Sequence, residues 1–230
     1  MRPANGRRAL VYERPESRGA IIMPGKLFIC DHPLIQEKLA TLRDRRTGHE
    51  EFRRTMAQVS TLLGAEALRG VRTKKTMVRT PLGKAPSLVT TQPVAFVAVL
   101  RAGLGMLPGL QHLLPQAHIG HIGLYRNEET LNPVRYYVRL PKNVKDCFVV
   151  LCDPMLATGG SAVESLHILK TDKARQIVLL SLIAAKAGVA RVHKEHPDVP
   201  IYLAGVDSNL NRSGFIIPGL GDAGDRLFAT

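Results

Sequence analysis

The sequence predicts an α/β protein whose mostly parallel, twisted sheet is flanked by helices. Two continuous apolar runs, residues 94–100 and 147–152, are typical of strands that are buried on both faces. Segments of helical character alternate with such runs along most of the chain, as in a parallel sheet with crossover helices. The length of 230 residues and the hydrophobic content of 45% suit one domain with its own core.

The N-terminal part of this domain is expected to be helical, at residues 33–46 and 50–68, with Gly70 as a stop signal. The second segment has apolar residues at helical spacing on one face: Phe52, Met56, Val59 and Leu63. Residues 71–92 mix Thr, Pro, Gly and Lys, which indicates irregular strands or an arm.

The sheet is expected to follow this helical segment and arm. Strands are predicted at residues 94–100, 118–125, 134–140, 147–152, 176–185 and 201–206. Helices are predicted between them at residues 104–114, 161–170 and 187–196. Because ligands of such sheets bind at the carboxyl ends of the strands, the loops after the strands are where we expect a site.

The chain carries a net charge of +13, with +9 on residues 1–80 and +4 on residues 81–230. A basic surface attracts nucleic acid, membranes or phosphorylated small molecules. The absence of Trp and the aromatic content of 5% leave little for stacking bases, so we do not expect nucleic acid as a partner. No apolar run approaches the ~20 residues that span a bilayer, so no membrane association is expected either.

Cysteine usage and the N-terminus complete the outline of the chain. The three cysteines show no CxxC spacing, so neither a disulfide framework nor a zinc cluster is indicated, and a reducing cytoplasm fits best. Residues 1–25 are rich in Arg, Pro and Gly without periodicity. We expect a flexible basic tail there, with Met23 as an alternative start, and a single domain over residues 26–230.

The most informative stretch is the buried strand at 147–152 followed by the sequence DPMLATGGS, residues 153–161. Glycines let a backbone approach a ligand closely, and the free N–H groups of the following helix favour an anion. The hydroxyls of Thr158 and Ser161 are further donors, and Asp153 suits sugar hydroxyls. The stretch fits a sugar-phosphate site, and it fits equally a plain strand–helix turn with Ser161 as N-cap.

Three further features lie in loops. The run Gly219–Gly224 has the spacing G-x-G-x-x-G, but with only six residues after it no βαβ unit can follow. We interpret it as a tight loop with backbone open to a ligand and Asp222 held in it. Arg101 and Arg126 each follow an apolar strand, and arginine suits bidentate binding of phosphate.

These motifs resemble a known family. The sequence DPMLATGGS is similar to the 5-phosphoribosyl-1-diphosphate (PRPP) loop of type I phosphoribosyltransferases. The Asp153-Pro154 pair, together with VLRAGLGM (99–106), LYRNEETLNP (124–133) and IIPGLGDAGDR (216–226), resembles uracil phosphoribosyltransferases specifically. The resemblance runs from about Ile29 to the C-terminus and implies the type I fold with a C-terminal base-binding loop region and an N-terminal helical segment or arm.

The resemblance implies a role for each matching residue. Arg101 and Arg126 would bind PRPP, and Arg101 and Asp222 would be the catalytic residues. The ribose and 5-phosphate would be held by Asp153, Pro154, Met155, Leu156, Ala157, Thr158, Gly159, Gly160 and Ser161. Uracil would be bound by Ile216, Gly221, Asp222 and Ala223. Mg²⁺ would be bound mainly through PRPP, with Asp222 nearby and also facing PRPP.

The implied reaction is uracil + PRPP → UMP + diphosphate, a step of pyrimidine salvage in the cytoplasm. The family also implies a homodimer or higher homo-oligomer, and GTP as a possible effector. Phe215 stands where the family usually has Tyr, so any contact of that hydroxyl is lost. Two alternatives stay open: a nucleotide-sensing, RNA-binding regulator on the same fold, and a phosphoribosyltransferase for another base.

Overall fold

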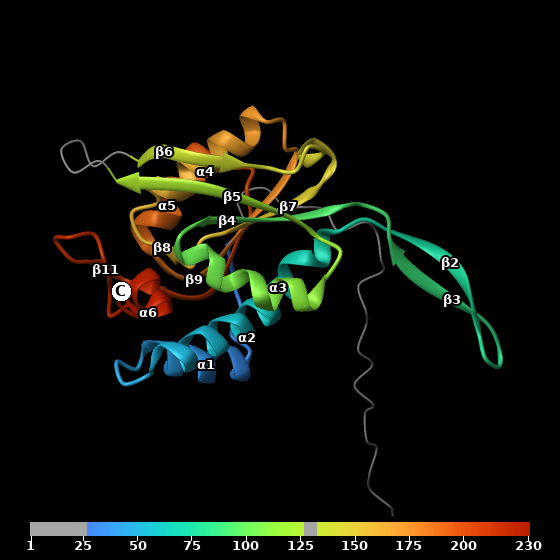
Figure 1. The fold of residues 1–230 in the computed structure, drawn as a ribbon, viewed down its shortest axis with the longest axis horizontal. Helices are drawn as coiled ribbons and strands as arrows, with labels where there is room; N and C mark the ends of the chain where they lie inside the picture. Colours follow the sequence, from blue (N-terminus) through green and yellow to red (C-terminus); the bar gives the residue numbers. More distant parts are fainter. Residues whose placement is uncertain (1–26, 127–132) are drawn as a thin grey trace, which may run out of the picture.

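The computed structural model describes residues 27–126 and 133–230 (Figure 1). The tail expected at residues 1–25, with Met23, lies outside the described residues, and the single domain expected over residues 26–230 stays a prediction. Of the motif 124–133, residues 127–132 also lie outside them, and Arg126 is described through its backbone alone.

Within the described residues, eight strands form the central sheet, in the order β1-β10-β9-β7-β4-β5-β6, with β8 beside β9. They are β1 (Leu27–Ile29), β4 (Val94–Leu100), β5 (His118–Arg126), β6 (Pro133–Arg139), β7 (Phe148–Cys152), β8 (Met155–Leu156), β9 (Gln176–Ala185) and β10 (Ile201–Asp207). Every neighbouring pair is parallel except β5 and β6. The prediction of a mostly parallel sheet is confirmed.

Helices cover both faces of this sheet (Figure 1). Helices α1 (Pro33–Arg43), α2 (His49–Ala67) and α3 (Leu107–Leu113) bury apolar residues in one cluster. Helices α4 (Gly160–Thr171) and α5 (Lys186–Glu195) bury theirs in a second cluster on the other face. The residues of β7 alternate between the two clusters, which is why its apolar run is continuous.

Residues 71–92 form a projecting arm (Figure 1). Strands β2 (Thr73–Thr80) and β3 (Gly83–Thr90) pair antiparallel from Thr73↔Thr90 to Thr80↔Gly83. The strands are regular, so the arm is confirmed and the expectation of irregular strands was wrong. Met77, Leu82 and Leu88 on this arm are 59%, 100% and 57% exposed.

Short elements account for the other differences from the prediction. The helix expected at 104–114 begins as the 3-10 turn η2 (Ala102–Met106) and continues as α3. Strand β1, the short pair β11 (Asn209–Leu210) and β12 (Ile216–Ile217), and the C-terminal helix α6 (Ala223–Phe228) were not predicted. Two more 3-10 turns are η1 (Leu68–Gly70), which carries the predicted stop after α2, and η3 (Val144–Asp146). In the described part of the chain, no helix is long and apolar enough to cross a membrane.

Candidate active site

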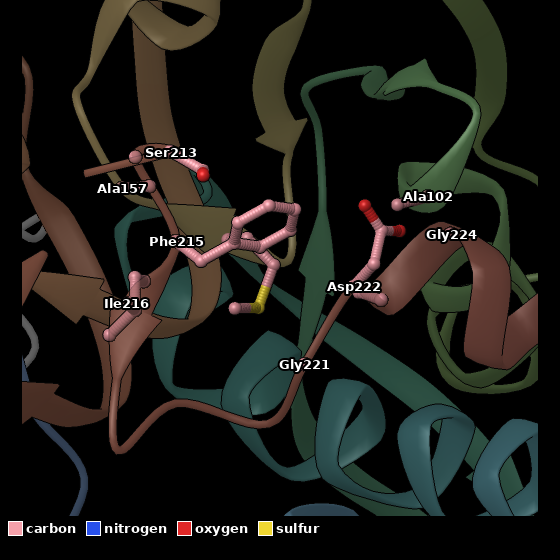
Figure 2. A pocket seen from close by; sticks show the side chains of 11 residues that line it. Ala102, Ala157, Ser213, Phe215, Ile216, Gly221, Asp222 and Gly224 are labelled. Atoms are coloured by element: carbon pink, nitrogen blue, oxygen red, sulfur yellow. The ribbon is translucent and has the colours of Figure 1, made fainter. Parts of the chain in front are cut away.

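Loops that follow the parallel strands meet around a cavity of about 260 Å³ (Figure 2). Three separate segments line it: η2 after β4, the segment after β7, and the chain after β10. The lining residues are Ala102, Met155, Ala157, Ser213, Gly214, Phe215, Ile216, Gly221, Asp222, Ala223 and Gly224. The cavity therefore lies at the carboxyl edge of the sheet, where the topology places ligands.

The glycine-rich loop, residues 153–161, joins β7 to α4. Asp153 opens it, and its backbone N–H donates to the Leu180 carbonyl at 3.1 Å. Burial raises the pKa of the Asp153 carboxyl to about 7, and the Met155 N–H, 3.4 Å from Oδ1, opposes that rise. An acid with this pKa loses its proton near neutrality and then accepts hydrogen bonds from hydroxyl groups.

The turn into α4 depends on Gly159. This residue has φ +79°, and a Cβ there would lie 2.9 Å from the Gly188 carbonyl oxygen on α5. Gly159 is the N-cap of α4, which begins at Gly160. The interpretation of Ser161 as the N-cap was therefore wrong, because the helix starts one residue before it. The N-cap residue has no side chain, and the Gly160 N–H donates to Oγ1 of Thr158 at 3.5 Å, while the other N–H groups of the first turn have no partner within the helix.

A second cavity of about 400 Å³ adjoins the first, since both are lined by Ser213 and Gly214. Thr158 lines it from the glycine-rich loop, and Arg191 of α5 and Arg212 add two positive charges. A Cβ at Gly160 would lie 3.4 Å from Nη1 of Arg191. Sequence reasoning missed Arg191, because only packing of α5 against the loop brings it to the start of α4.

Arg101 follows β4 and precedes Ala102, which lines the first cavity, but Arg101 is not itself among the lining residues. Its Nη2 donates to Oδ1 of Asp225 at 3.2 Å, and its guanidinium carbon lies 5.6 Å from the ring centroid of Phe228. Both partners belong to α6. A Cβ at Gly224 would lie 3.9 Å from Nη2 of Arg101 and 3.2 Å from Oδ1 of Asp222, so Gly224 separates the two groups.

The C-terminal loop, residues 211–222, is held in place by Asp207 at the end of β10. Both carboxylate oxygens of Asp207 accept from Arg43 of α1, at 2.7 and 2.8 Å, and Oδ2 also accepts from the Gly219 N–H at 2.8 Å. Arg43 donates in turn to the Gly219 carbonyl at 2.8 Å. The ion pair holds the pKa of Asp207 below its ordinary value, against the effect of burial.

Arg226 attaches the following helix, α6, to the N-terminal helices. Its guanidinium lies 4.4 Å from the ring centroid of Phe52 and donates to the carbonyls of Leu42, Leu220 and Asp44. Burial lowers the pKa of this group. The loop and α6 are thus held by arginines whose partners lie far away in the sequence.

Asp222 is the N-cap of α6. Its Oδ1 accepts from the Asp225 N–H at 2.9 Å, and Figure 2 shows the carboxylate at the rim of the cavity beside Ala102 and Gly224. The ring of Phe215 points toward the middle of the same cavity (Figure 2). Asp222 therefore combines a place at the rim with a capping role that the sequence did not indicate.

The structure places seven of the fifteen predicted site residues in the lining of the two cavities. Met155, Ala157, Ile216, Gly221, Asp222 and Ala223 line the first cavity, and Thr158 lines the second. Leu156 instead packs in the hydrophobic core, and the carbonyl of Pro154 accepts from Leu182 and Ile183 of β9. Among the described residues there is no cluster of three or more His, Cys, Asp or Glu that could hold a metal ion.

Comparisons with known proteins identify the family. The model of the uracil phosphoribosyltransferase family matches residues 29–230. The chain belongs to this family. A uracil phosphoribosyltransferase of Geobacillus sp. is 50% identical over 207 residues, which are 90% of this chain and 99% of the relative. That of Bacillus licheniformis is also 50% identical, over the same shares of both chains.

A solved structure of the AQ2163 protein from Aquifex aeolicus has the same fold as this chain. It superposes with a TM-score of 0.84 at 38% identity and covers 89% of this chain and 98% of the other. The family match spans all the segments that line the first cavity.

Proposed function

We propose that this chain transfers the 5-phosphoribosyl group from PRPP to uracil and so forms UMP and diphosphate. The observation that carries the proposal is the first cavity, in which η2, the glycine-rich loop and the C-terminal loop meet. These three segments hold three of the family's motifs, and each offers the chemistry that one part of the substrates requires.

The glycine-rich loop binds the ribose 5-phosphate end of PRPP. The N–H groups at the start of α4 and the hydroxyl of Thr158 donate to the 5-phosphate, and Arg191 adds positive charge from α5. Asp153 accepts from the ribose hydroxyls. Arg101 and Arg126 bind PRPP from the ends of β4 and β5, and Arg101 meets the diphosphate.

The C-terminal loop binds uracil through backbone N–H and C=O groups of Ile216, Gly221, Asp222 and Ala223. Asp207 and Arg226 hold the backbone of Gly219 and Leu220, which directly precede Gly221. A wrong base would leave polar groups of this loop without partners. Positive charge builds on the ribose as diphosphate leaves. The positive charge of Arg101 stabilises the leaving group, and the loops place uracil N1 at the anomeric carbon.

Magnesium fits this site as an ion carried by PRPP. Mg²⁺ is commonly bound by one or two carboxylates together with substrate phosphates. The described residues hold no larger ligand cluster, and Asp222 offers one carboxylate at the rim. When bound, the ion neutralises negative charge on the diphosphate.

The assembly and setting of the enzyme are also part of the proposal. A homodimer or higher homo-oligomer is supported by the exposed apolar residues of the β2–β3 arm. A cytoplasmic location is supported by free Cys30, Cys147 and Cys152. Activation by GTP is tested by adding GTP to the assay below.

The test is PRPP consumption by the full chain with uracil, cytosine, orotate, hypoxanthine and adenine in turn, with the nucleotide product identified. We expect turnover with uracil alone and UMP as the product. Turnover with another base would show that the enzyme has a different base specificity. RNA binding that weakens steeply with salt, without any turnover, would establish the regulator instead.

A further inference from the structure

Arg101 is oriented by the C-terminal helix, and one residue of that helix holds it directly. Within the described residues, the ion pair and the ring contact of the Arg101 guanidinium are both with α6, through Asp225 at 3.2 Å and Phe228 at 5.6 Å. An arginine side chain has many rotamers, so a guanidinium at the edge of a cavity needs such partners to stay in one place.

Asp225 also holds the second charged group at the rim. Its backbone N–H donates to Oδ1 of Asp222 at 2.9 Å, while its own Oδ1 accepts from Arg101 and from the Thr230 hydroxyl, the latter at 3.2 Å. One residue therefore connects Arg101 with Asp222 across Gly224, at which a Cβ would lie within 4 Å of both groups.

We propose that Asp225 is a positioning residue, which aims the Arg101 guanidinium at the diphosphate of PRPP and fixes it relative to Asp222. This inference rests on the proposed function and extends it to a residue outside the motif positions to which the family assigns a role. The Asp225 carboxylate accepts from the Arg101 guanidinium, so its effect on the reaction is exerted through Arg101.

The geometry favours this role over a purely structural one. The side chains of Arg101 and Asp225 are 55% and 52% exposed, and ion pairs with that exposure contribute little to folding. The position of a charged group matters far more to a reaction than to the fold, because a displacement of about 1 Å can cost up to a hundredfold in rate. Loss of the Asp225 carboxylate should therefore change catalysis more than stability.

The test is a double-mutant cycle on the full chain with Asp225→Ala, Arg101→Ala and the double variant. We expect Asp225→Ala to lower kcat/KM for PRPP about tenfold, to change KM for uracil less than about twofold and to leave Tm nearly unchanged. In the Arg101→Ala background, the same substitution should change kcat/KM for PRPP less than about twofold, because the group that it positions is gone.

Two further variants make the cycle specific. Asp225→Asn keeps an oxygen that accepts from Arg101 and should recover part of the loss. Thr230→Ala is the matched control, because it removes another hydrogen bond from the same carboxylate oxygen and leaves the Arg101 contact intact. It should behave like the wild type.

The outcomes separate this proposal from the proposed function. Effects of Asp225→Ala and Arg101→Ala that multiply in the double variant would overturn the positioning role, as would a Thr230→Ala loss equal to that of Asp225→Ala. A wild-type chain without uracil turnover would overturn the proposed function. The cycle would then be run on the Kd for PRPP by calorimetry, where the same coupling is expected and its absence would refute the role of Asp225.

Discussion

The glycine-rich loop and the C-terminal loop reach the same cavity, but they are held in place in opposite ways. The glycine-rich loop runs from β7 through the short strand β8 into α4, and backbone hydrogen bonds to β9 and the turn at Gly159 fix it. The C-terminal loop depends on Asp207 and Arg226, whose partners Arg43 and Leu42 lie 164 and 184 residues away in the sequence. The first loop is thus held by β9 and α5, which follow soon after it in the sequence, whereas the second is held by helices at the other end of the chain.

Removal of the Asp207 carboxylate should lower the stability of the protein more than any other change described below. Asp207→Ala leaves Arg43 without its ion-pair partner and the buried Gly219 N–H without an acceptor. The pair is partly buried, and breaking it costs about 3 kcal/mol, which lowers Tm by roughly 6–12 °C in a chain of this size. Thermal melts measure the loss, and kinetics should show a raised KM for uracil.

Glu51→Gln is the control for the Asp207 variant. It breaks the surface pair of Glu51 with Arg54, in which the two side chains are half exposed or more, so Tm should barely change. An Asp207→Ala protein that melts like Glu51→Gln would show that the C-terminal loop does not depend on its ion pair with the distant helix α1.

The same contrast explains which parts of the molecule the sequence predicted. The strand β9 was predicted at its observed bounds, and β7 and α4 to within one residue, because continuous apolar runs and helical spacing are local signals. Helix α6 has six residues, too few for a periodic pattern. Strand β1 has three and was missed for the same reason.

In the candidate site too, the sequence predicted some residues and missed others. The motif residues could be named from local sequence, whereas the contact of Arg101 with Asp225 and the place of Arg191 depend on packing between distant segments. One signal was available for Asp207. It is an acid directly after an apolar strand, the same pattern that singled out Asp153 after β7.

The two roles of Asp222 can be separated by a pair of substitutions. Asn is as good an N-cap as Asp, so Asp222→Asn should keep the cap of α6 and remove the charge, while Asp222→Ala removes both. We expect each to lower kcat about 100-fold, or about 2.7 kcal/mol, because both lack the carboxylate. Melts should show a further loss of about 1 kcal/mol for the Ala variant alone. Normal turnover of Asp222→Asn would reduce this residue to a helix cap.

Substitution of Asp153 should lower activity less than substitution of Asp222. It should also change the pH dependence of PRPP binding, which the C-terminal loop does not control. Asp153→Asn keeps the size of the side chain but cannot accept from two ribose hydroxyls as a carboxylate does. We expect kcat/KM for PRPP to fall at least about tenfold, because a hydrogen bond to a charged group contributes about 1.5–3 kcal/mol. In the wild type KM for PRPP should rise as the pH falls below about 7, the pKa of the Asp153 carboxyl, and it should rise less in the Asn variant.

Stability should change in the opposite direction to activity at this position. A carboxyl with a raised pKa in the folded protein releases its proton more readily when unfolded, so folding loses stability as the pH rises from the ordinary value of 3.8 to about 7. The amide of Asp153→Asn carries no such charge. The variant should therefore melt several degrees above the wild type at pH 8, a gain on the order of 2 kcal/mol, and the difference should vanish toward pH 4. An Asn variant that melts lower than the wild type at pH 8 would mean that the carboxylate stabilises the loop, and that Asp153 resembles Asp207 after all.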